Sequence, residues 1–506
     1  MFKQLTPQII LGIVGLYFVV LMVIAYFTSR GAKNDDFFIA GRKSPWYLVA
    51  FGMIGASLSG VTFISIPGVV GGEGTNMGYS YMQVVLGYML GYFVIATVLM
   101  PVYYRLNLTS IYTYLEKRFG FFSYKTGAAF FILSRTIGAA FRLFLVAIVL
   151  QQFVMEPLGV HFTITVAIII LLIWIYTFQG GIKTIVWTDS LQTFCMLAAV
   201  ILTVLAIGDA MNLSVGGLIS KVQNSDYSQV FFFEGGWGDK NNFFKQFFSG
   251  AALAIVMTGL DQDMMQKNLS CKNIGEAQKN MFWFSIVLIF ANLLFLTLGA
   301  LLYMYAGEIE LEMPMRNGAA ARDLLYPTIA LEHLSPTVGI VFILGLIAAA
   351  YSSADSALTS LTTSFCVDFL NFNKKKDQDS PRLKNTRRLV HIGFSVLLFL
   401  VILLFYFIND RSVINQLFTI ASYTYGPLLG LYAFGFFMKR RIQDSLAPLV
   451  CIAAPILTFI LNTYSETLLF GYKFGFELLI LNGFLTFVGL FLISKKGSQV
   501  GNLEEE

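Results

Sequence analysis

Long apolar segments recur along almost the whole chain of 506 residues, and they restrict its possible folds more than any other feature. Crossing the hydrocarbon core of a bilayer takes roughly 20 apolar residues in one helix. The segments lie at about 8–28, 47–70, 81–104, 126–155, 162–181, 187–208, 247–266, 281–305, 337–369, 389–408, 413–438, 445–463 and 475–494. The sequence therefore predicts an all-α polytopic membrane protein with about 13 transmembrane helices.

The composition supports this class and excludes others. Only 12% of the residues are charged and 57% are hydrophobic, whereas a soluble protein carries about a quarter charged residues. A soluble multidomain enzyme and a disordered chain are therefore excluded. We expect one membrane domain over residues 1–506, with the first segment retained because it is too long for a signal peptide. The net charge of +5 is explained by membrane topology, and we expect no nucleic-acid partner.

Lys and Arg residues are distributed unevenly between the connections, which predicts the orientation. With the N-terminus outside, 24 of the 34 basic residues fall in inside connections and 8 in outside ones. This alternation requires an odd number of spans. We therefore predict a multi-pass protein of the cell (plasma or inner) membrane, with the N-terminus outside and the C-terminus in the cytoplasm.

Two apolar segments contain residues that interrupt a helix. Residues 55–68 of the second segment are rich in Gly and hydroxyl side chains, although close helix packing is an alternative explanation. The seventh segment carries Asp261 and Asp263, and Asp263 has the alternative of pairing with Lys267 in water beyond the helix end. These segments are five apart, and corresponding interruptions in two five-helix halves are typical of an inverted-repeat transporter.

Hydroxyl side chains concentrate in the ninth segment. In a helix, Ser352 and Ser353 share a face with Ala349. Together with carbonyl groups of an interrupted neighbouring helix, these hydroxyls would suit a monovalent cation. The alternative is that they bond to carbonyl groups of their own helix.

Three charged residues elsewhere also lie in or near apolar segments. Arg135 and Arg142 are seven residues apart, within about 20° of one helix face. Each needs an acidic partner or an anionic ligand, although Arg135 has the alternative of reaching the cytoplasmic end. From its spacing, Asp189 is predicted to cap the sixth helix.

Together these motifs resemble the sodium:solute symporter family, which includes sodium–proline, sodium–galactose and sodium–sialic acid symporters. The resemblance covers nearly the whole chain. Its most specific motifs are Leu58-Ser59-Gly60 with Pro67, the run from Gly180-Gly181 through Asp189 to Gln192, Gln262 with Gln266, and Ser352-Ser353-Ala354-Asp355-Ser356. Residues 109–120 also look like a cytoplasmic loop of the family, except that Thr113 stands where glutamate is common.

The resemblance implies a LeuT-like core of five plus five helices. The first repeat would be 47–208 and the second 247–438, with an extra helix at 8–28 and C-terminal helices at 445–494. It implies a sodium site made by the carbonyl groups of Gly55, Leu58 and Ala349 and the hydroxyls of Ser352 and Ser353. It further places a second ion site or the sodium exit path at Asp189, Asp355 and Ser356.

The expected function is sodium-coupled import of a small organic solute, such as a carboxylate of the sugar-acid or sialic-acid kind. The carboxylate-binding arginine of the sialic acid branch falls on Gly138, so Arg135 or Arg142 would replace it. The solute-binding candidates are Ser57, Ser59, Thr62, Gln83, Arg135, Arg142, Asp261 and Gln262. Alternatives are a sodium/sugar symporter, a proline-type amino-acid symporter, or a proton-coupled symporter of the same fold.

The sequence does not favour an enzyme. Its three histidines are far apart and its four cysteines have no metal-ligand spacing, so neither can form a catalytic cluster. We expect sodium, the solute and the lipid bilayer as partners, and no obligatory protein partner.

Overall fold

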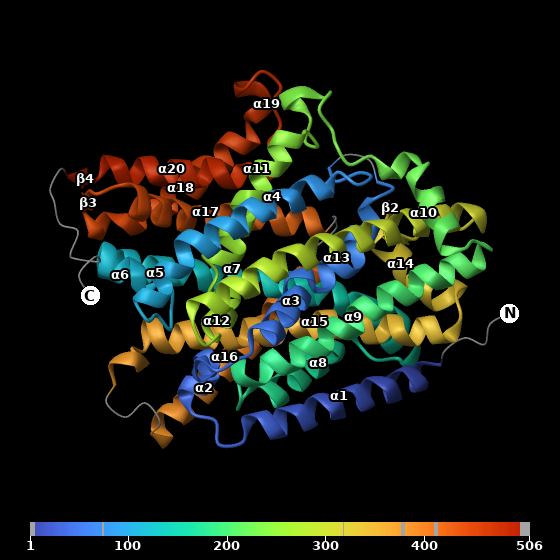
Figure 1. Ribbon diagram of the computed structural model, residues 1–506, viewed down its shortest axis with the longest axis horizontal. Coiled ribbons are helices and arrows are strands. Elements are labelled where there is room, and N and C mark those ends of the chain that lie inside the picture. The colour runs from blue at the N-terminus through green and yellow to red at the C-terminus, as the bar shows by residue number, and fades with distance from the viewer. Residues whose placement is uncertain (1–5, 73–74, 317, 376–379, 409–412, 496–506) are drawn as a thin grey trace.

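The structure is a computed structural model that describes residues 6–72, 75–316, 318–375, 380–408 and 413–495 (Figure 1). Its α-helices are α1 (Pro7–Ser29), α2 (Asn34–Ile39), α3 (Trp46–Val69), α4 (Tyr81–Val94), α5 (Met100–Arg105), α6 (Thr113–Arg118), α7 (Phe121–Leu150), α8 (Phe162–Thr177), α9 (Ile182–Ala210), α10 (Val215–Gln223), α11 (Phe243–Ala254), α12 (Gln262–Leu269), α13 (Ile274–Glu308), α14 (Leu325–Thr328), α15 (Pro336–Ser364), α16 (Pro381–Ile408), α17 (Val413–Phe437), α18 (Ala447–Thr463), α19 (Ser465–Leu468) and α20 (Leu478–Leu492).

Short turns extend several of these helices, and the strands are minor. The π-helical turns are η2 (Ile95–Leu99), η3 (Gln151–Met155), η7 (Ile255–Gly259), η9 (Ile329–His333) and η10 (Phe365–Phe369). The antiparallel strand pairs are β1 (Met315–Arg316) with β2 (Ala319–Ala320), and β3 (Arg441–Ile442) with β4 (Ser494–Lys495).

Each of the thirteen predicted apolar segments coincides with a helix or with consecutive helices. Within the described residues, nine helices are long and apolar enough to cross a membrane, or ten if the bent pair of 243–259 and 262–269 is one span. Helices α8 and α20 are apolar but have only 16 and 15 residues. The multi-pass architecture is confirmed, and the number thirteen stays a prediction.

Burial separates a central group of helices from a peripheral one. We compared the most apolar stretch of 18 residues in each helix. In this stretch 89% of the residues are buried in α3, and 22% are buried in each of α1 and α18. Figure 1 shows α3 and α15 crossing the middle of the bundle, α1 along its lower edge and α18 and α20 at its upper edge. Helix α15 packs against α3, α7 and α9. The polar segments predicted from the sequence therefore lie in the centre, away from lipid.

Both predicted helix interruptions are present. Inside α3, Ser59 has φ 48° and ψ 175°, which no α-helical residue adopts. The seventh segment bends by 64° between the end of η7 at Gly259 and the start of α12 at Gln262. Glycine contacts are also close here, since a Cβ atom on Gly55 would lie 2.3 Å from Thr193 Oγ1. Close packing and a helix break thus occur together in α3.

Helices α4 and α11 lie in close contact, and a substitution at this contact can test how tightly they pack. A Cβ atom on Gly250 would lie 2.2 Å from the backbone oxygen of Val84. We expect Gly250→Ala to lower the free energy of unfolding by about 1–3 kcal/mol, because a backbone atom cannot rotate away. The control is Gly12→Ala, since nothing lies within 4 Å of its added Cβ atom. Thermal unfolding in detergent measures both variants, and equal midpoints would contradict the prediction.

Candidate functional site

A polar cavity lies beside the break in α3. It has about 710 Å³ of empty space, a volume that includes space open to solvent. Its lining residues come from α3, α4, α7, α11, η7, α12, α13 and α17, so both predicted repeats contribute. They are Ala56, Ser57, Leu58, Ser59, Val61, Thr62, Tyr81, Tyr88, Tyr92, Arg135, Arg142, Leu253, Ala254, Met257, Thr258, Met264, Leu288, Asn292 and Phe418.

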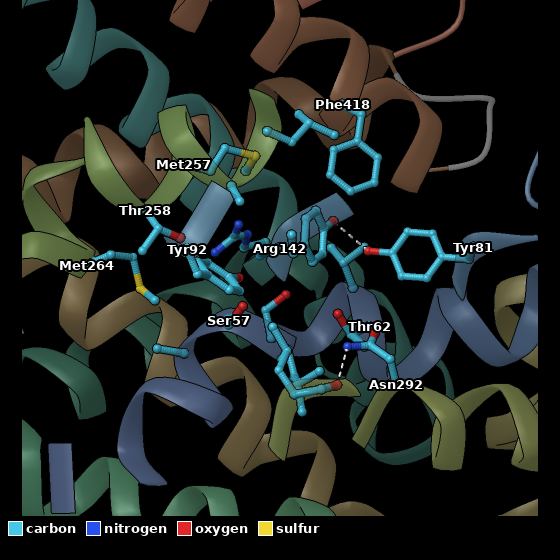
Figure 2. Close-up of a pocket in the computed structure, with 18 of the residues that line it drawn as sticks. Ser57, Thr62, Tyr81, Tyr92, Arg142, Met257, Thr258, Met264, Asn292 and Phe418 are labelled. Atoms are coloured by element: carbon cyan, nitrogen blue, oxygen red, sulfur yellow. Dashed lines mark hydrogen bonds between the residues drawn. The ribbon is translucent and has the colours of Figure 1, made fainter. Parts of the chain in front are cut away.

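Five of the predicted solute-binding residues line this cavity. They are Ser57, Ser59, Thr62, Arg135 and Arg142. Figure 2 shows the Arg142 side chain pointing into the middle of the group, close to Tyr92, with Thr62 and Asn292 on the opposite side. The lining residues of α3 lie on both sides of the break at Ser59.

Gln83 lies outside the lining. Its amide nitrogen donates to the backbone oxygen of Asn241 at 2.8 Å and to Gln246 Oε1 at 3.0 Å, and its amide oxygen accepts from the Phe232 N–H. These hydrogen bonds hold the loop that precedes α11, which is a structural role.

Asp261 and Gln262 also lie outside the lining. Asp261 caps α12 by accepting from the backbone N–H groups of Asp263 and Met264, and it accepts from the Tyr425 hydroxyl at 2.5 Å. Gln262 bonds to the backbone of the 109–111 segment. The break in the seventh segment therefore directs both side chains into the surrounding structure.

The two arginines of α7 differ in their partners. Arg135 forms a buried ion pair with Asp263, so the hypothesis that Asp263 pairs with Lys267 in water was wrong. The Arg142 side chain makes no hydrogen bond or ion pair with any described residue. The Nε atoms of both arginines are buried without a partner, so the ion pair with Asp263 is what distinguishes Arg135. A buried guanidinium without a partner is costly. Of the two, Arg142 is the one available to an anionic ligand.

The ion pair of Arg135 predicts a clear stability effect. Arg135→Leu should lower the free energy of unfolding by about 3–5 kcal/mol, because it leaves the carboxylate of Asp263 buried and unpaired. The double variant with Asp263→Leu should recover most of this loss. Arg142→Leu is the matched control, since it orphans no carboxylate. Equal losses in the two single variants, measured by thermal unfolding, would contradict the assignment.

The sequence analysis missed three tyrosines of α4. Tyr81, Tyr88 and Tyr92 all line the cavity, and the Tyr81 and Tyr88 hydroxyls lie 3.0 Å apart. Spacings of seven and four residues put them on one helix face, so this periodicity was the available signal. Thr258 and Asn292 were also missed, and each is a single polar residue in an otherwise apolar stretch.

The predicted sodium ligands Ser352 and Ser353 have an unusual environment. Both Oγ atoms are buried and have no hydrogen-bond partner. Thr362 and Thr363 of the same helix instead donate to the carbonyl oxygens four residues earlier, at 2.6 and 2.8 Å. Bonding within the helix, the alternative for the two serines, is therefore absent at these positions. Their helix packs against α3, which carries the break.

The structure corrects the prediction for Asp189. Helix α9 begins at Ile182, so Asp189 lies inside the helix and does not cap it. Its Oδ2 atom accepts from Lys267 Nζ at 2.7 Å, and both side chains are buried. Lys267 is thus no part of an exposed inside connection. Asp355 accepts from the Tyr176 hydroxyl at 2.7 Å and from the Ser356 N–H at 2.5 Å.

A polar cavity next to a broken helix, with corresponding breaks in two segments five apart, defines a secondary transporter. Comparison with known proteins identifies its family. The chain belongs to the sodium:solute symporter family, whose sequence model matches residues 37–445.

Its relatives and structural neighbours are transporters. The chain is 26% identical to the sodium/sialic acid symporter NanT of Aliivibrio fischeri, over 92% of this chain and 90% of that protein. It is 23% identical to the sodium/sialic acid symporter SiaT of Proteus mirabilis, over 89% and 88%. A solved structure of a Na⁺-coupled sialic acid symporter in a substrate-bound outward-open state has a TM-score of 0.80, with 21% identity, over 97% and 99% of the two chains.

These findings confirm the LeuT-like fold and the transport class. The chain is a sodium-coupled symporter of a small organic solute in a membrane, with sodium and the solute as its cargo.

Proposed function

We propose that the solute carries a carboxylate, as a sugar acid or sialic acid does, and binds in the cavity beside the break in α3. The observation that carries this proposal is the unpartnered guanidinium of Arg142 in the cavity, next to an Arg135 that Asp263 neutralises. A guanidinium binds a carboxylate through two parallel hydrogen bonds. The printed names of the two bacterial relatives agree with such a solute.

The rest of the lining suits a solute with several polar groups. No Asp or Glu is among the lining residues, so the cavity favours an anion. Ser57, Thr62 and Asn292 offer hydroxyl and amide groups, and the tyrosines of α4 offer further hydroxyls. In Figure 2, Tyr92 lies near Ser57, and Tyr81 lies on the side of Thr62 and Asn292. Met257, Met264 and Phe418 add apolar surface for a carbon skeleton.

Sodium is proposed to bind between α3 and α15. The ligands would be the carbonyl groups of Gly55, Leu58 and Ala349 and the hydroxyls of Ser352 and Ser353. The break at Ser59 supports this set, because it removes regular helical partners from carbonyl groups of the preceding turn. The two unpartnered hydroxyls support it from the side of α15.

Coupling follows from the shared position of both sites on α3. Sodium would steady the broken helix and thereby shape the solute cavity, and the solute must then favour sodium binding equally. Alternating access would arise from movement of the repeats 47–208 and 247–438 around these sites.

The membrane potential would also drive uptake. One charge moving through 100 mV contributes roughly 2.3 kcal/mol. This electrical term alone supports accumulation on the order of fifty-fold.

The proposed orientation keeps the N-terminus outside. The start of α1 and the strand β4 lie at opposite ends of the helix bundle, as an odd number of crossings requires (Figure 1). Removing the buried Lys267 from the inside connections leaves the bias of basic residues at 23 to 8.

A thermal-shift screen with the purified protein tests the function. Sialic acids, sugar acids, neutral sugars, amino acids and vitamins are compared in sodium and in choline buffer. We expect an acid to raise the unfolding midpoint in sodium and to have little effect in choline, because bound ligand stabilises by mass action. Stabilisation by neutral sugars alone would reject the carboxylate. Uptake into liposomes that ignores sodium and follows a pH gradient would reject sodium coupling.

A further inference from the structure

An apolar groove separate from the solute cavity lies between α8 and α16. It has about 760 Å³ of empty space, a volume that includes space open to the surroundings, and its lining includes Leu171, Ile392 and Val396. Between 41% and 54% of each of these three residues is exposed. The Ser395 hydroxyl, which also lines the groove, donates to the His391 carbonyl of its own helix at 2.9 Å. The groove therefore suits a hydrocarbon chain better than a polar solute.

The two helices that form the groove run antiparallel. At one end the Phe162 ring of α8 stacks on the Tyr406 ring of α16, with their centroids 4.2 Å apart. At the other end the Thr177 hydroxyl and His391 Nε2 lie 3.1 Å apart. The groove thus lies between the end of α8 and the beginning of α16, and it joins a helix of the first predicted repeat to a helix of the second.

A positive charge lies at the end of the groove where α16 begins. The Arg388 guanidinium lies over the Phe178 ring, 5.8 Å from its centroid, and this ring stacks at 5.0 Å on Trp174, which lines the groove. Arg388 is exposed, and it makes no hydrogen bond or ion pair with any residue in the described part of the chain. Lys384 lies one turn earlier on the same face of α16. A basic end thus adjoins an apolar groove.

The length of this arrangement matches one leaflet of a bilayer. Arg388 and Phe399, which lines the groove, are 11 positions apart, or about 16 Å along a helix. Half of the hydrocarbon core is about 15 Å thick. In the orientation proposed above, the beginning of α16 faces the cytoplasm, where the leaflet carries anionic lipids. A phosphate at Arg388 would place an acyl chain of its lipid along the groove.

We propose that the groove between α8 and α16 binds an anionic phospholipid of the cytoplasmic leaflet. The Arg388 guanidinium would bind the phosphate through two hydrogen bonds, Lys384 would add attraction for the negative charge, and the acyl chain would lie against Leu171, Ile392 and Val396. Because the lipid would contact a helix of each repeat, it would stabilise the arrangement of the repeats present in this structure.

The test uses the delipidated full-length protein in detergent, without sodium or solute. Its unfolding midpoint is titrated with dioleoyl phosphatidylglycerol, with dioleoyl phosphatidylcholine and with glycerol 3-phosphate, and native mass spectrometry counts the bound lipids. We expect phosphatidylglycerol to bind at least about five-fold more tightly than phosphatidylcholine, because each basic residue near the headgroup contributes attraction to a net negative charge. Glycerol 3-phosphate should not stabilise the protein, since it has no acyl chain.

Two pairs of variants separate the headgroup from the chain. Arg388→Gln should weaken phosphatidylglycerol binding by about five-fold, whereas Arg382→Gln should not, because Arg382 is exposed on another face of the same helix. Ala167→Trp places a large side chain in the groove and should weaken both lipids. Its control is Ile168→Trp, since Ile168 is exposed beside the groove and does not line it.

Several results would overturn this inference while leaving the proposed function intact. They are equal affinity of the wild-type protein for the two lipids, equal effects within either pair of variants, and stabilisation by glycerol 3-phosphate alone. A dimer that Ala167→Trp dissociates would assign the groove to a second copy of the chain and would also overturn it. If a variant does not fold, the wild-type comparison of the two lipids decides.

Discussion

Replacing Ser352 and Ser353 together by alanine is expected to abolish sodium-stimulated uptake while the protein stays folded. A hydrogen bond or contact to a charged group contributes about 1.5–3 kcal/mol. Losing two such ligands should therefore weaken sodium binding by at least about 100-fold. Uptake of the solute found in the screen, measured against sodium concentration in liposomes, checks this result.

The fold should not suffer in this double variant. Neither hydroxyl has a hydrogen-bond partner, so alanine removes no bond and relieves two buried unsatisfied groups. The unfolding midpoint without sodium should be equal to or above that of the wild-type protein. Ser360→Ala is the matched control on the same helix, because the Ser360 hydroxyl donates to the Ala357 carbonyl at 3.0 Å. Wild-type sodium dependence in the double variant would refute the site.

Arg142→Gln is expected to raise the KM for carboxylate solutes by about 10- to 100-fold, corresponding to about 1.5–3 kcal/mol for lost hydrogen bonds to a charge. The KM for a neutral analogue, such as the amide of the same acid, should change little. Arg142→Lys keeps the charge without the planar fork and should give an intermediate KM. Uptake kinetics for the acid and its amide measure the difference.

The contrast with Arg135 sharpens this expectation. Arg135 is paired with Asp263, so its loss should appear mainly as lower stability, and the loss of Arg142 mainly as weaker solute binding. Equal increases of KM for the acid and the amide in Arg142→Gln would reject a carboxylate at this position.

Local patterns were enough to predict the helices and their interruptions. The hydroxyl-rich run of the second segment and the acidic run of the seventh both weaken a helix through residues within one or two turns. The structure accordingly places a positive φ at Ser59 and a 64° bend after Gly259. The same local reasoning failed for Asp189, because helix α9 begins five residues before the predicted start of its segment.

The sequence by itself determined that this protein spans a membrane, where its central helices break, and which polar residues need an explanation, because each property depends on neighbours within a few turns. Only the tertiary structure decided how the charges pair. Asp263 lies four residues from Lys267, yet it pairs with Arg135, 128 positions away, and Lys267 pairs with Asp189. Pairing across helices depends on which faces pack together. Of the two guanidinium groups on α7, this packing pairs that of Arg135 and leaves that of Arg142 without a partner.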